Sequence, residues 1–434
     1  MPQFLFTTDA DFEGQFVALL GAKREDSPDV DAVVASIIAD VRSRGDAAVI
    51  ELTSKFDRFD LTANTMRFSQ VEIEVECAKV SDGDRAALML AADRIRAYHL
   101  RQMPSDAMWT DDAGATLGWR WTPVSAAGLY VPGGLASYPS SVLMNAIPAK
   151  VAGVGRLAIV VPTPDGKINP LVILAATIAG VDEIYRIGGA QAVAALAYGT
   201  QTIPAVDKIT GPGNAFVAAA KRRVFGKVGI DMIAGPSEIL VIADVDNNPD
   251  WIALDLLSQA EHDECAQSVL ITDDVAFGHA VAAAVDVRLL TLNRRAIAGK
   301  SWADFGAIII VKDMSEAVLL SDRIAPEHLE ICTVDCEEMA NRVTHAGAIF
   351  IGSWTPEAIG DYISGPNHVL PTARSARFSS GLSVMDFIKR TTLARMTPDA
   401  LSAIGPSAER LAKSESLEAH GLSVRVRLDR LNQP

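Results

Sequence analysis

A short polar segment, SQAEHDE at residues 258–264, combines residue types that bind metal ions. Gln259 and His262 are three positions apart at the end of an expected helix, so they share a face and can point at one centre. Asp255 lies one turn earlier on that face. Imidazole nitrogen with amide and carboxylate oxygen suits zinc or a similar divalent ion. Glutamine is an uncommon ligand, however, and a polar helix end is the alternative.

The segment IAPEHLEI, residues 324–331, places Glu327 and His328 together after a proline. Histidine has the ordinary pKa best placed for proton transfer near neutrality, and a partly desolvated glutamate can approach it. The pair therefore suits general-base catalysis. An ordinary loop with one exposed acid and one capping histidine is the alternative.

Further polar groups gather in GDYISGPNHVLPT, residues 360–372, which contains Asp361, Asn367 and His368. Glycine and proline favour an irregular backbone there, and the side chains offer ligands and hydrogen bonds. Loops of this kind at the ends of α/β strands commonly form active sites. The segment is therefore a third candidate for the site.

The fourth candidate is ESLEAH, which places Glu415 and His420 five residues apart. On one ideal helix they would lie about 140° apart, so a helix end between them, or a broad site, is required to bring them together. A ligand set for one zinc ion can be assembled from Gln259, His262, Asp361 and His420. Cys332 and Cys336 have no second pair and are interpreted as core residues, and a nucleophilic Cys265 is a minor alternative.

Glycine turns indicate a nucleotide site. IGGAQ (187–191) and TGPGNA (210–215) each follow an expected strand and open a helix, an arrangement that lets a phosphate approach helix N-terminal amides. Gly211 and Gly213 match the first two glycines of G-x-G-x-x-G, but the third is absent. A further turn, GLYVPGG (128–134), adds an aromatic residue, Tyr130.

The secondary structure expected to position these residues changes from helical to alternating strands and helices along the chain. The first hundred residues are expected to be helical, because apolar residues recur every three or four positions in 29–46 and in 83–103. These stripes comprise Val30, Val33, Val34, Ile37, Ile38 and Val41 in the first segment and Leu88, Leu90, Ile95 and Leu100 in the second. The segment WTDDAGATLGWRWTP is expected to be a hairpin or linker.

From about residue 128, apolar strands such as LAIVV and EILVIAD alternate with alanine-rich helices. This pattern predicts an α/β fold with two parallel-sheet units in tandem, joined near residue 235, plus small helical N-terminal and C-terminal elements. The expected divisions are 1–127, 128–236, 237–380 and 381–434. The last segment, helical at 401–420 with an alternating VRVRL, is too small to fold alone and is expected to pack on another domain or a partner subunit.

Composition excludes several classes of protein. The 434 residues carry 39 basic and 54 acidic side chains, a net charge of −15, which disfavours binding to nucleic acid or an anionic membrane. No apolar run approaches the roughly 18 residues of a membrane span, and the acidic start does not resemble a signal peptide. Four cysteines are too few for a disulfide framework, so a cytoplasmic protein is expected.

Taken in order, these motifs resemble histidinol dehydrogenase over nearly the whole chain. The segments that carry the resemblance are GLYVPGG, IGGAQAVAALAYGT, TGPGNAFVAAAKR, IDMIAGPSEILVIAD, DLLSQAEHD, APEHLEI, GSWTPEAIGDYISGPNHVLPT and SGLSVMDF. The resemblance implies a zinc-dependent, NAD-linked oxidation of L-histidinol to L-histidine through L-histidinaldehyde, the last step of histidine biosynthesis. It also implies that the two parallel-sheet units are incomplete Rossmann-like domains, and that the protein is a homodimer with interlocked subunits and shared active sites.

Residue by residue, the resemblance assigns zinc to Gln259, His262, Asp361 and His420. Substrate contacts are assigned to Ser237, Gln259, His262, Glu327, His328, Asp361, His368, Glu415 and His420. His420 and Glu415 are expected to reach the partner subunit's site. NAD is assigned to Tyr130, Gln191 and Asn214. Leu135 and Ser416 depart from residues that are frequent in relatives, without touching the zinc set.

The resemblance also implies a division of catalytic work. His328 is expected to take the hydroxyl proton in the first oxidation and a diol proton in the second, while Glu327 activates the water that hydrates the aldehyde. Three alternatives remain: a related enzyme that oxidises another small polar diol, such as a sulfonated one, a zinc hydrolase that uses Glu327, or a binding protein without chemistry. The retained Glu415, Asp361 and His368 favour histidinol over an anionic sulfonate, and the glycine turns favour a dehydrogenase.

Overall fold

The computed structural model describes residues 2–21, 28–132, 138–233 and 235–431. Leu135 and the two glycines directly before it, Gly133 and Gly134, lie outside these ranges. Contacts divide the chain into two compact units. Unit 1 comprises the residues up to Arg101 together with Ser125–Phe387, and unit 2 comprises Gln102–Val124 together with the residues from Ile388 onward. Among the described residues, no helix is both long enough and apolar enough to cross a membrane.

Unit 1 contains two parallel sheets, and the first follows the strand–helix alternation predicted from the sequence. Its strand order is β6-β5-β4-β7-β8, and every pairing is parallel. The strands are β4 (Ala126–Tyr130), β5 (Arg156–Val160), β6 (Glu183–Tyr185), β7 (Lys208–Thr210) and β8 (Gly229–Ile230). Since the chain winds outward from β4 in both directions, the topological switch point lies between β4 and β7.

The second sheet is also parallel throughout, in the order β1-β11-β10-β9-β12-β13. The strands are β1 (Gln3–Phe6), β9 (Glu238–Ala243), β10 (Gln267–Thr272), β11 (Ala307–Ile310), β12 (His328–Cys332) and β13 (Ala348–Ile351). Its switch point lies between β9 and β12. Strand β1 corrects the prediction that the first hundred residues are helical: Leu5 is fully buried and pairs with Ile309, a partner that local periodicity cannot reveal.

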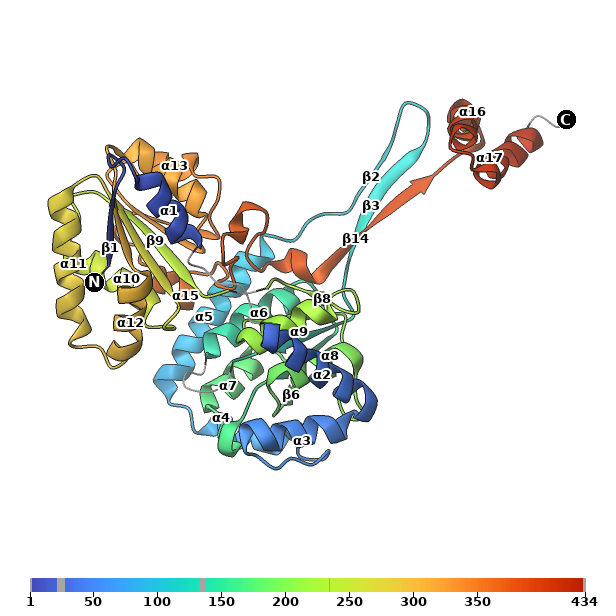
Figure 1. The fold of residues 1–434 in the computed structure, drawn as a ribbon. Coiled ribbons are helices and arrows are strands. Elements are labelled where there is room, and N and C mark those ends of the chain that lie inside the picture. The colour runs from blue at the N-terminus through green and yellow to red at the C-terminus, as the bar shows by residue number, and fades with distance from the viewer. Residues whose placement is uncertain (1, 22–27, 133–137, 234, 432–434) are drawn as a thin grey trace. The chain divides into compact units, whose positions relative to one another are not determined.

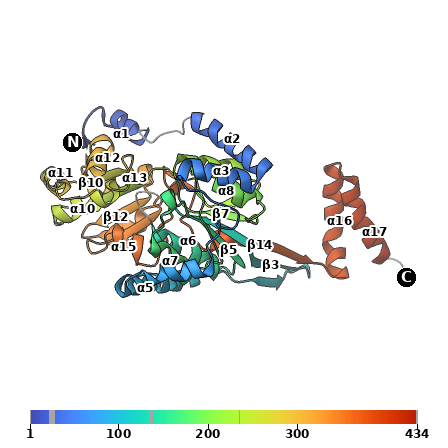
Figure 2. The ribbon, with the colours of Figure 1, turned by 90° about the horizontal axis from the view of Figure 1, so that it is seen from below.

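Helices cover both faces of each sheet, as expected for apolar parallel strands. On the first sheet (Figure 2), one face carries α2 (Pro28–Arg44), α3 (Asp46–Asp57), α8 (Gly189–Tyr198) and α9 (Ala215–Val224), and the other carries α5 (Asp82–Leu100), α6 (Pro139–Val151) and α7 (Pro170–Ala179). Helix α4 (Gln70–Ala78) packs on α7. On the second sheet (Figure 1), α10 (Pro249–Ala260), α11 (Val275–Leu289) and α12 (Arg295–Phe305) lie opposite α1 (Phe12–Gly21), α13 (Met314–Ile324) and α14 (Cys336–Arg342). The short α15 (Glu357–Tyr362) packs on α10.

The two helices predicted near the N-terminus are present, but some of the residues expected on their buried faces are exposed. In α2, Val34, Ile37, Ile38 and Val41 are buried, but Val33 is 45% exposed. In α5, Leu90 and Leu100 are exposed, and the buried face consists of Ala91, Ala92, Ile95 and His99. Small side chains let α5 approach α6 and α7 closely, which leaves the larger leucines outside the contact.

Unit 2 combines an antiparallel sheet with two helices. The sheet has the order β14-β3-β2, with β2 (Ala107–Thr110), β3 (Thr116–Pro123) and β14 (Ile388–Arg395), so the predicted hairpin is present. The helices are α16 (Pro398–Ser414) and α17 (Glu418–Leu431). The alternating VRVRL lies within α17 and is helical. In the tail from Ile388 to Leu431, which the structure describes, only Ile388 and Ala400 are buried apolar residues, so this tail has almost no core of its own.

Candidate active site

The Glu327–His328 pair lies at the switch point of the second sheet, on the edge where its strands begin. Strand β9 starts directly after Ser237, and the neighbouring β12 starts directly after Glu327. The Glu327 Oε2 atom accepts a hydrogen bond from the backbone amide of Glu238 at 3.0 Å. Ligand sites of open α/β sheets ordinarily lie at the opposite, carboxyl-terminal edge. The cluster therefore occupies an edge that the motifs alone did not indicate.

The contacts of His328 determine where its proton sits. Its Nδ1 lies 3.1 Å from the backbone carbonyl oxygen of Glu238 and 3.1 Å from Oε1 of Gln259. Both oxygens are acceptors, so Nδ1 carries the proton and donates, and Nε2 of the neutral ring keeps its lone pair. Nε2 is buried and makes no hydrogen bond to any residue that the structure describes. It is the atom of this ring that can take a proton from a bound molecule.

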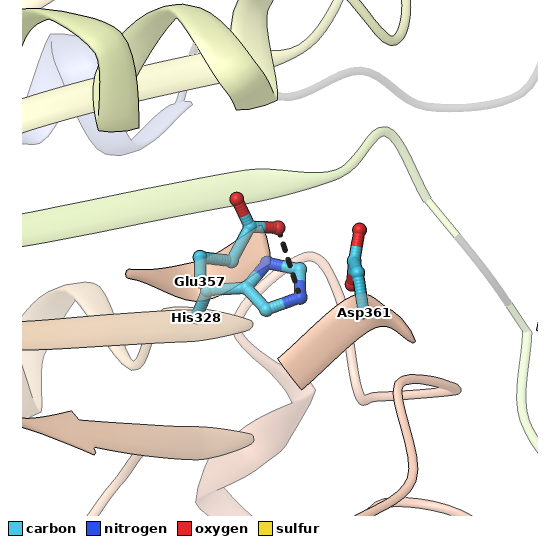
Figure 3. Close-up of side chains that lie close together, drawn as sticks. All are labelled: His328, Glu357 and Asp361. Carbon is cyan, nitrogen blue, oxygen red and sulfur yellow. Dashed lines mark ion pairs between the residues drawn. The ribbon is translucent and has the colours of Figure 1, made fainter. Parts of the chain in front are cut away.

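Two carboxylates of α15 lie near that nitrogen (Figure 3). Glu357 Oε1 is 3.5 Å from His328 Nε2, and Asp361 follows one helical turn later. One ligand atom from each of these three residues lies within 4.8 Å of the others. Burial acts to lower the pKa of His328, but the neighbouring carboxylates, first that of Glu357, raise it above its ordinary value. The surroundings therefore favour a proton on Nε2 once it is taken up.

Gln259 and His262 lie together at the end of α10. The Gln259 Nε2 atom is 3.3 Å from His262 Nδ1. Zinc bonds of about 2.1 Å place two ligand atoms of one ion roughly 3.0–3.5 Å apart, so this separation fits once the amide turns by 180° to present its oxygen. His328 Nδ1 then keeps its bond to the carbonyl of Glu238. Burial lowers the pKa of His262, which favours the neutral ring that binds metals. With the nearby carboxylate of Asp361, this donor set fits zinc.

His368 connects this edge of the second sheet to helix α6. Its Nδ1 donates to the backbone carbonyl of Asp361 at 2.9 Å, and its Nε2 accepts from the Ser141 hydroxyl at 3.3 Å. Asn367, the preceding residue, donates to the backbone carbonyl of Met144 at 2.5 Å. Burial lowers the pKa of His368. A neutral imidazole is therefore held beside Asp361.

Glu415 and His420 belong to unit 2, where both are exposed. A helix end separates them, as their angular spacing requires: α16 ends at Ser414 and α17 begins at Glu418. Between them Ser416 adopts φ 61°, in the left-handed region that favours glycine. The roles of Glu415 and His420 in the site, which lies in unit 1, stay predictions.

All three glycine turns start at the carboxyl edge of the first sheet: two follow β4 and β7, at the switch point, and IGGAQ follows the outer strand β6. Tyr130 is the last residue of β4, and Gly211 directly follows the neighbouring β7. The Tyr130 hydroxyl accepts a hydrogen bond from the backbone amide of Gly189, the first residue of α8, at 3.0 Å. Burial raises the pKa of Tyr130 to about 12. The tyrosine therefore ties two of the turns together.

The other two predicted cofactor residues lie at helix N-termini. Gln191 is buried in the first turn of α8. Asn214 is exposed and caps α9, because its Oδ1 accepts hydrogen bonds from the amides of Phe216 at 3.1 Å and Val217 at 3.2 Å. Such helix starts present amides to an anion, as in dinucleotide sites.

Two buried acids of the cluster, Glu330 and Glu357, were not singled out in the sequence. Ser258 donates to Glu357 Oε2 at 2.9 Å, and Glu330 Oε1 accepts from the backbone amide of Glu357 at 2.5 Å. Burial raises the pKa of Asp255 to about 6 and that of Glu330 well above its ordinary value. The four-residue spacing of Glu357 and Asp361 on one helix was the available signal.

Comparison with known proteins identifies the family. The histidinol dehydrogenase family model matches residues 21–428. The histidinol dehydrogenase of Ruegeria pomeroyi is 78% identical over 432 residues, with 100% of each chain covered. That of Rhodospirillum rubrum is 64% identical over 431 residues, with 99% of each covered. The crystal structure of histidinol dehydrogenase from Elizabethkingia anophelis matches with a TM-score of 0.95 at 36% identity, covering 100% of this chain and 99% of that one. The chain therefore belongs to the histidinol dehydrogenase family.

Proposed function

We propose that this protein oxidises L-histidinol to L-histidine through L-histidinaldehyde, the last step of histidine biosynthesis. The balanced reaction consumes one water and two NAD and yields two NADH and three protons. The observation that carries the proposal is the lone pair on buried His328 Nε2, which stays available because Nδ1 holds the ring proton and donates it to the backbone carbonyl of Glu238. An alcohol that loses a hydride must also lose a proton, and this nitrogen can accept it.

Zinc is proposed to bind Gln259, His262 and Asp361, with His420 of a second copy as a further ligand. The 3.3 Å separation of the Gln259 and His262 side-chain atoms and the neutral form of His262 support this set. When bound, zinc supplies a positive charge that holds the amino and imidazole nitrogens of histidinol next to the base. Further substrate contacts are proposed for Ser237, Glu327, His328, His368 and Glu415.

Glu327 and His328 divide the proton transfers between them. His328 Nε2 takes the hydroxyl proton in the first oxidation. The Glu327 carboxylate takes a proton from the water that adds to the aldehyde, and His328 then takes a proton from the resulting diol. The hydrogen bond from the Glu238 amide fixes Glu327 beside His328, whose Nδ1 lies 3.9 Å from Glu327 Oε2. The two bases lie close together because Glu327 directly precedes β12, which begins with His328, and is hydrogen-bonded to the start of the neighbouring β9.

NAD is proposed to bind at the carboxyl edge of the first sheet, near Tyr130, Gln191 and Asn214. The switch point between β4 and β7 lies there, which is the usual place for such a ligand. The N-termini of α8 and α9 open from the same turns and present amides to a pyrophosphate.

A homodimer with shared active sites is proposed for the assembly. Helices α16 and α17 and the turn between them expose Leu411, Leu417, Leu422 and Val426, and the tail from Ile388 onward buries almost no apolar residues of its own. A second copy of the chain would cover these side chains and receive the exposed Glu415 and His420. A cytoplasmic location accords with a biosynthetic enzyme that uses NAD.

Incubation of the purified protein with L-histidinol and NAD, followed by chromatography of the products, tests the reaction. L-Histidine should accumulate. A sulfonated diol offered under the same conditions should not be consumed, and consumption of the sulfonated diol alone would assign the chain another alcohol. If no NADH forms with either substrate, the proposal is wrong.

A further inference from the structure

A buried ion pair lies directly behind the glycine turn that follows β7. Lys221 of α9 and Asp231, the residue after β8, form a salt bridge in which their side chains are 3% and 0% exposed. Burying two charges is costly unless they pair and satisfy further hydrogen bonds. Both charges also contact Gly211: its amide donates to Asp231 Oδ2 at 2.8 Å, and its carbonyl accepts from Lys221 Nζ at 2.9 Å. One glycine is therefore held through both of its backbone groups.

The ion pair lies where the hydrogen bonds between β7 and β8 end. The β7–β8 ladder ends with Ile209 opposite Ile230, and the Asp231 amide still donates to the Ile209 carbonyl at 3.2 Å. One step further, the Asp231 carboxylate replaces the backbone acceptor that Gly211 would otherwise require. The conformation of the turn at Gly211 is therefore held by the Asp231 side chain and not by backbone hydrogen bonds of the sheet.

Gly211 adopts a backbone conformation that needs such support. Its φ is +112°, which side chains rarely permit, and an added Cβ would lie 2.1 Å from the backbone oxygen of Tyr130. The turn therefore passes close to the end of β4, at the switch point. Three residues later, Asn214 caps α9 and fixes the other end of the turn.

We propose that Lys221 and Asp231 are positioning residues that hold the 211–214 turn ready for the NAD pyrophosphate before the cofactor arrives. This inference rests on the proposed NAD site, and it concerns residues that do not themselves contact the cofactor. A turn held in its binding conformation does not lose conformational freedom when the ligand binds, so affinity is higher than for a mobile turn.

The test compares two double variants of the full chain. Lys221→Met with Asp231→Leu removes both charges and leaves the Gly211 amide and carbonyl without these partners. The matched control is Arg223→Met with Asp31→Leu, which removes an exposed bidentate pair between α9 and α2. We expect KM for NAD and the dissociation constant measured by NADH fluorescence to rise by about tenfold or more in the first variant only. KM for histidinol and the zinc content should stay unchanged.

A graded variant separates positioning from general stability. Lys221→Met with Asp231→Asn keeps an acceptor for the Gly211 amide and should recover part of the NAD affinity. If the Leu variant binds NAD as the wild type does, or if only its thermal midpoint falls, the inference is wrong. If the wild type itself does not bind NAD, the proposed cofactor site fails instead.

Hydrogen exchange of the wild-type protein gives a second test that requires no variant. The peptide containing Gly211, Gly213 and Asn214 should exchange slowly without NAD, because the ion pair already holds the Gly211 amide. Fast exchange that becomes slow only when NAD is added would show that the cofactor orders the turn, and would overturn the inference.

Discussion

The Nδ1 atom of His328 lies 3.1 Å from the side-chain oxygen of Gln259, so the proposed base and a proposed zinc ligand are in direct contact. The contact uses Nδ1, whereas Nε2 is the nitrogen proposed to accept the substrate's proton. Base and metal ligand therefore lie side by side at the amino edge of the second sheet, although α10 and β12 are distant in the sequence.

Replacing His328 by Asn should separate catalysis from metal binding. His328 is proposed as a base and not as a zinc ligand, so kcat should fall by about 10²–10⁴-fold while zinc is retained. His262→Asn should lose the zinc. Steady-state kinetics and atomic emission measure both. Near-full turnover of His328→Asn would contradict the base assignment, whereas loss of zinc from it would place the metal on the His328, Glu357 and Asp361 group instead.

Glu327→Gln should impair the second oxidation more than the first. The amide can still accept a hydrogen bond from the Glu238 backbone, so the fold is kept, but it cannot take a proton from water. Rates measured separately with L-histidinol and with L-histidinaldehyde should show the larger loss for the aldehyde. Equal losses for both substrates would remove the water-activating role.

Acid should destabilise the protein through His99. This buried ring donates from Nδ1 to the Ile95 carbonyl at 2.7 Å, and its Nε2 lies 3.4 Å from the donor amide of Asn367, an arrangement for the neutral form. Burial lowers its pKa from the ordinary 6.5. The unfolded chain therefore takes up a proton first, so stability is complete above pH 6.5 and is lost as the pH falls below that value. Urea unfolding at several pH values should show a shallower acid loss for His99→Gln, and identical slopes would contradict this.

Ser416→Gly should stabilise the tail or leave it unchanged. Ser416 adopts φ 61° between α16 and α17, where a side chain costs roughly 1–2 kcal/mol and glycine does not. Glycine's extra freedom in the unfolded chain offsets part of this, which leaves a gain of up to about 1 kcal/mol. The thermal midpoint should rise slightly, while Ser414→Gly, at the end of α16, should lower it. A clear fall for Ser416→Gly would show that the serine side chain has a role of its own.

The sequence predicted most elements because their signals are local. The apolar strands β9, β10 and β11 and the hairpin β2–β3 follow directly from strand length and alternation. Strand β1 was missed because it pairs with β11, about three hundred residues away. In α5 the large leucines suggested a face, but close helix packing selected Ala91 and Ala92 instead.

The residues of the candidate site could likewise be predicted from local motifs, but their contacts across the fold could not. Family resemblance indicated Gln259, His262 and His328, but it did not indicate that the cluster forms at the amino edge of the second sheet. Glu357 was passed over because its relation to His328 depends on a helix returning to that edge. Nothing in the sequence marked Lys221 and Asp231, because their proposed role depends on hydrogen bonds to Gly211 that form only in the folded chain.

The most direct measurement is the number of NADH formed per L-histidinol consumed, followed by absorbance, before and after chelation and with zinc restored. The account predicts two NADH per substrate, lost on chelation and recovered with zinc. One NADH with accumulating aldehyde would keep the dehydrogenase and remove the role of Glu327. No NADH from protein that holds zinc would contradict the account.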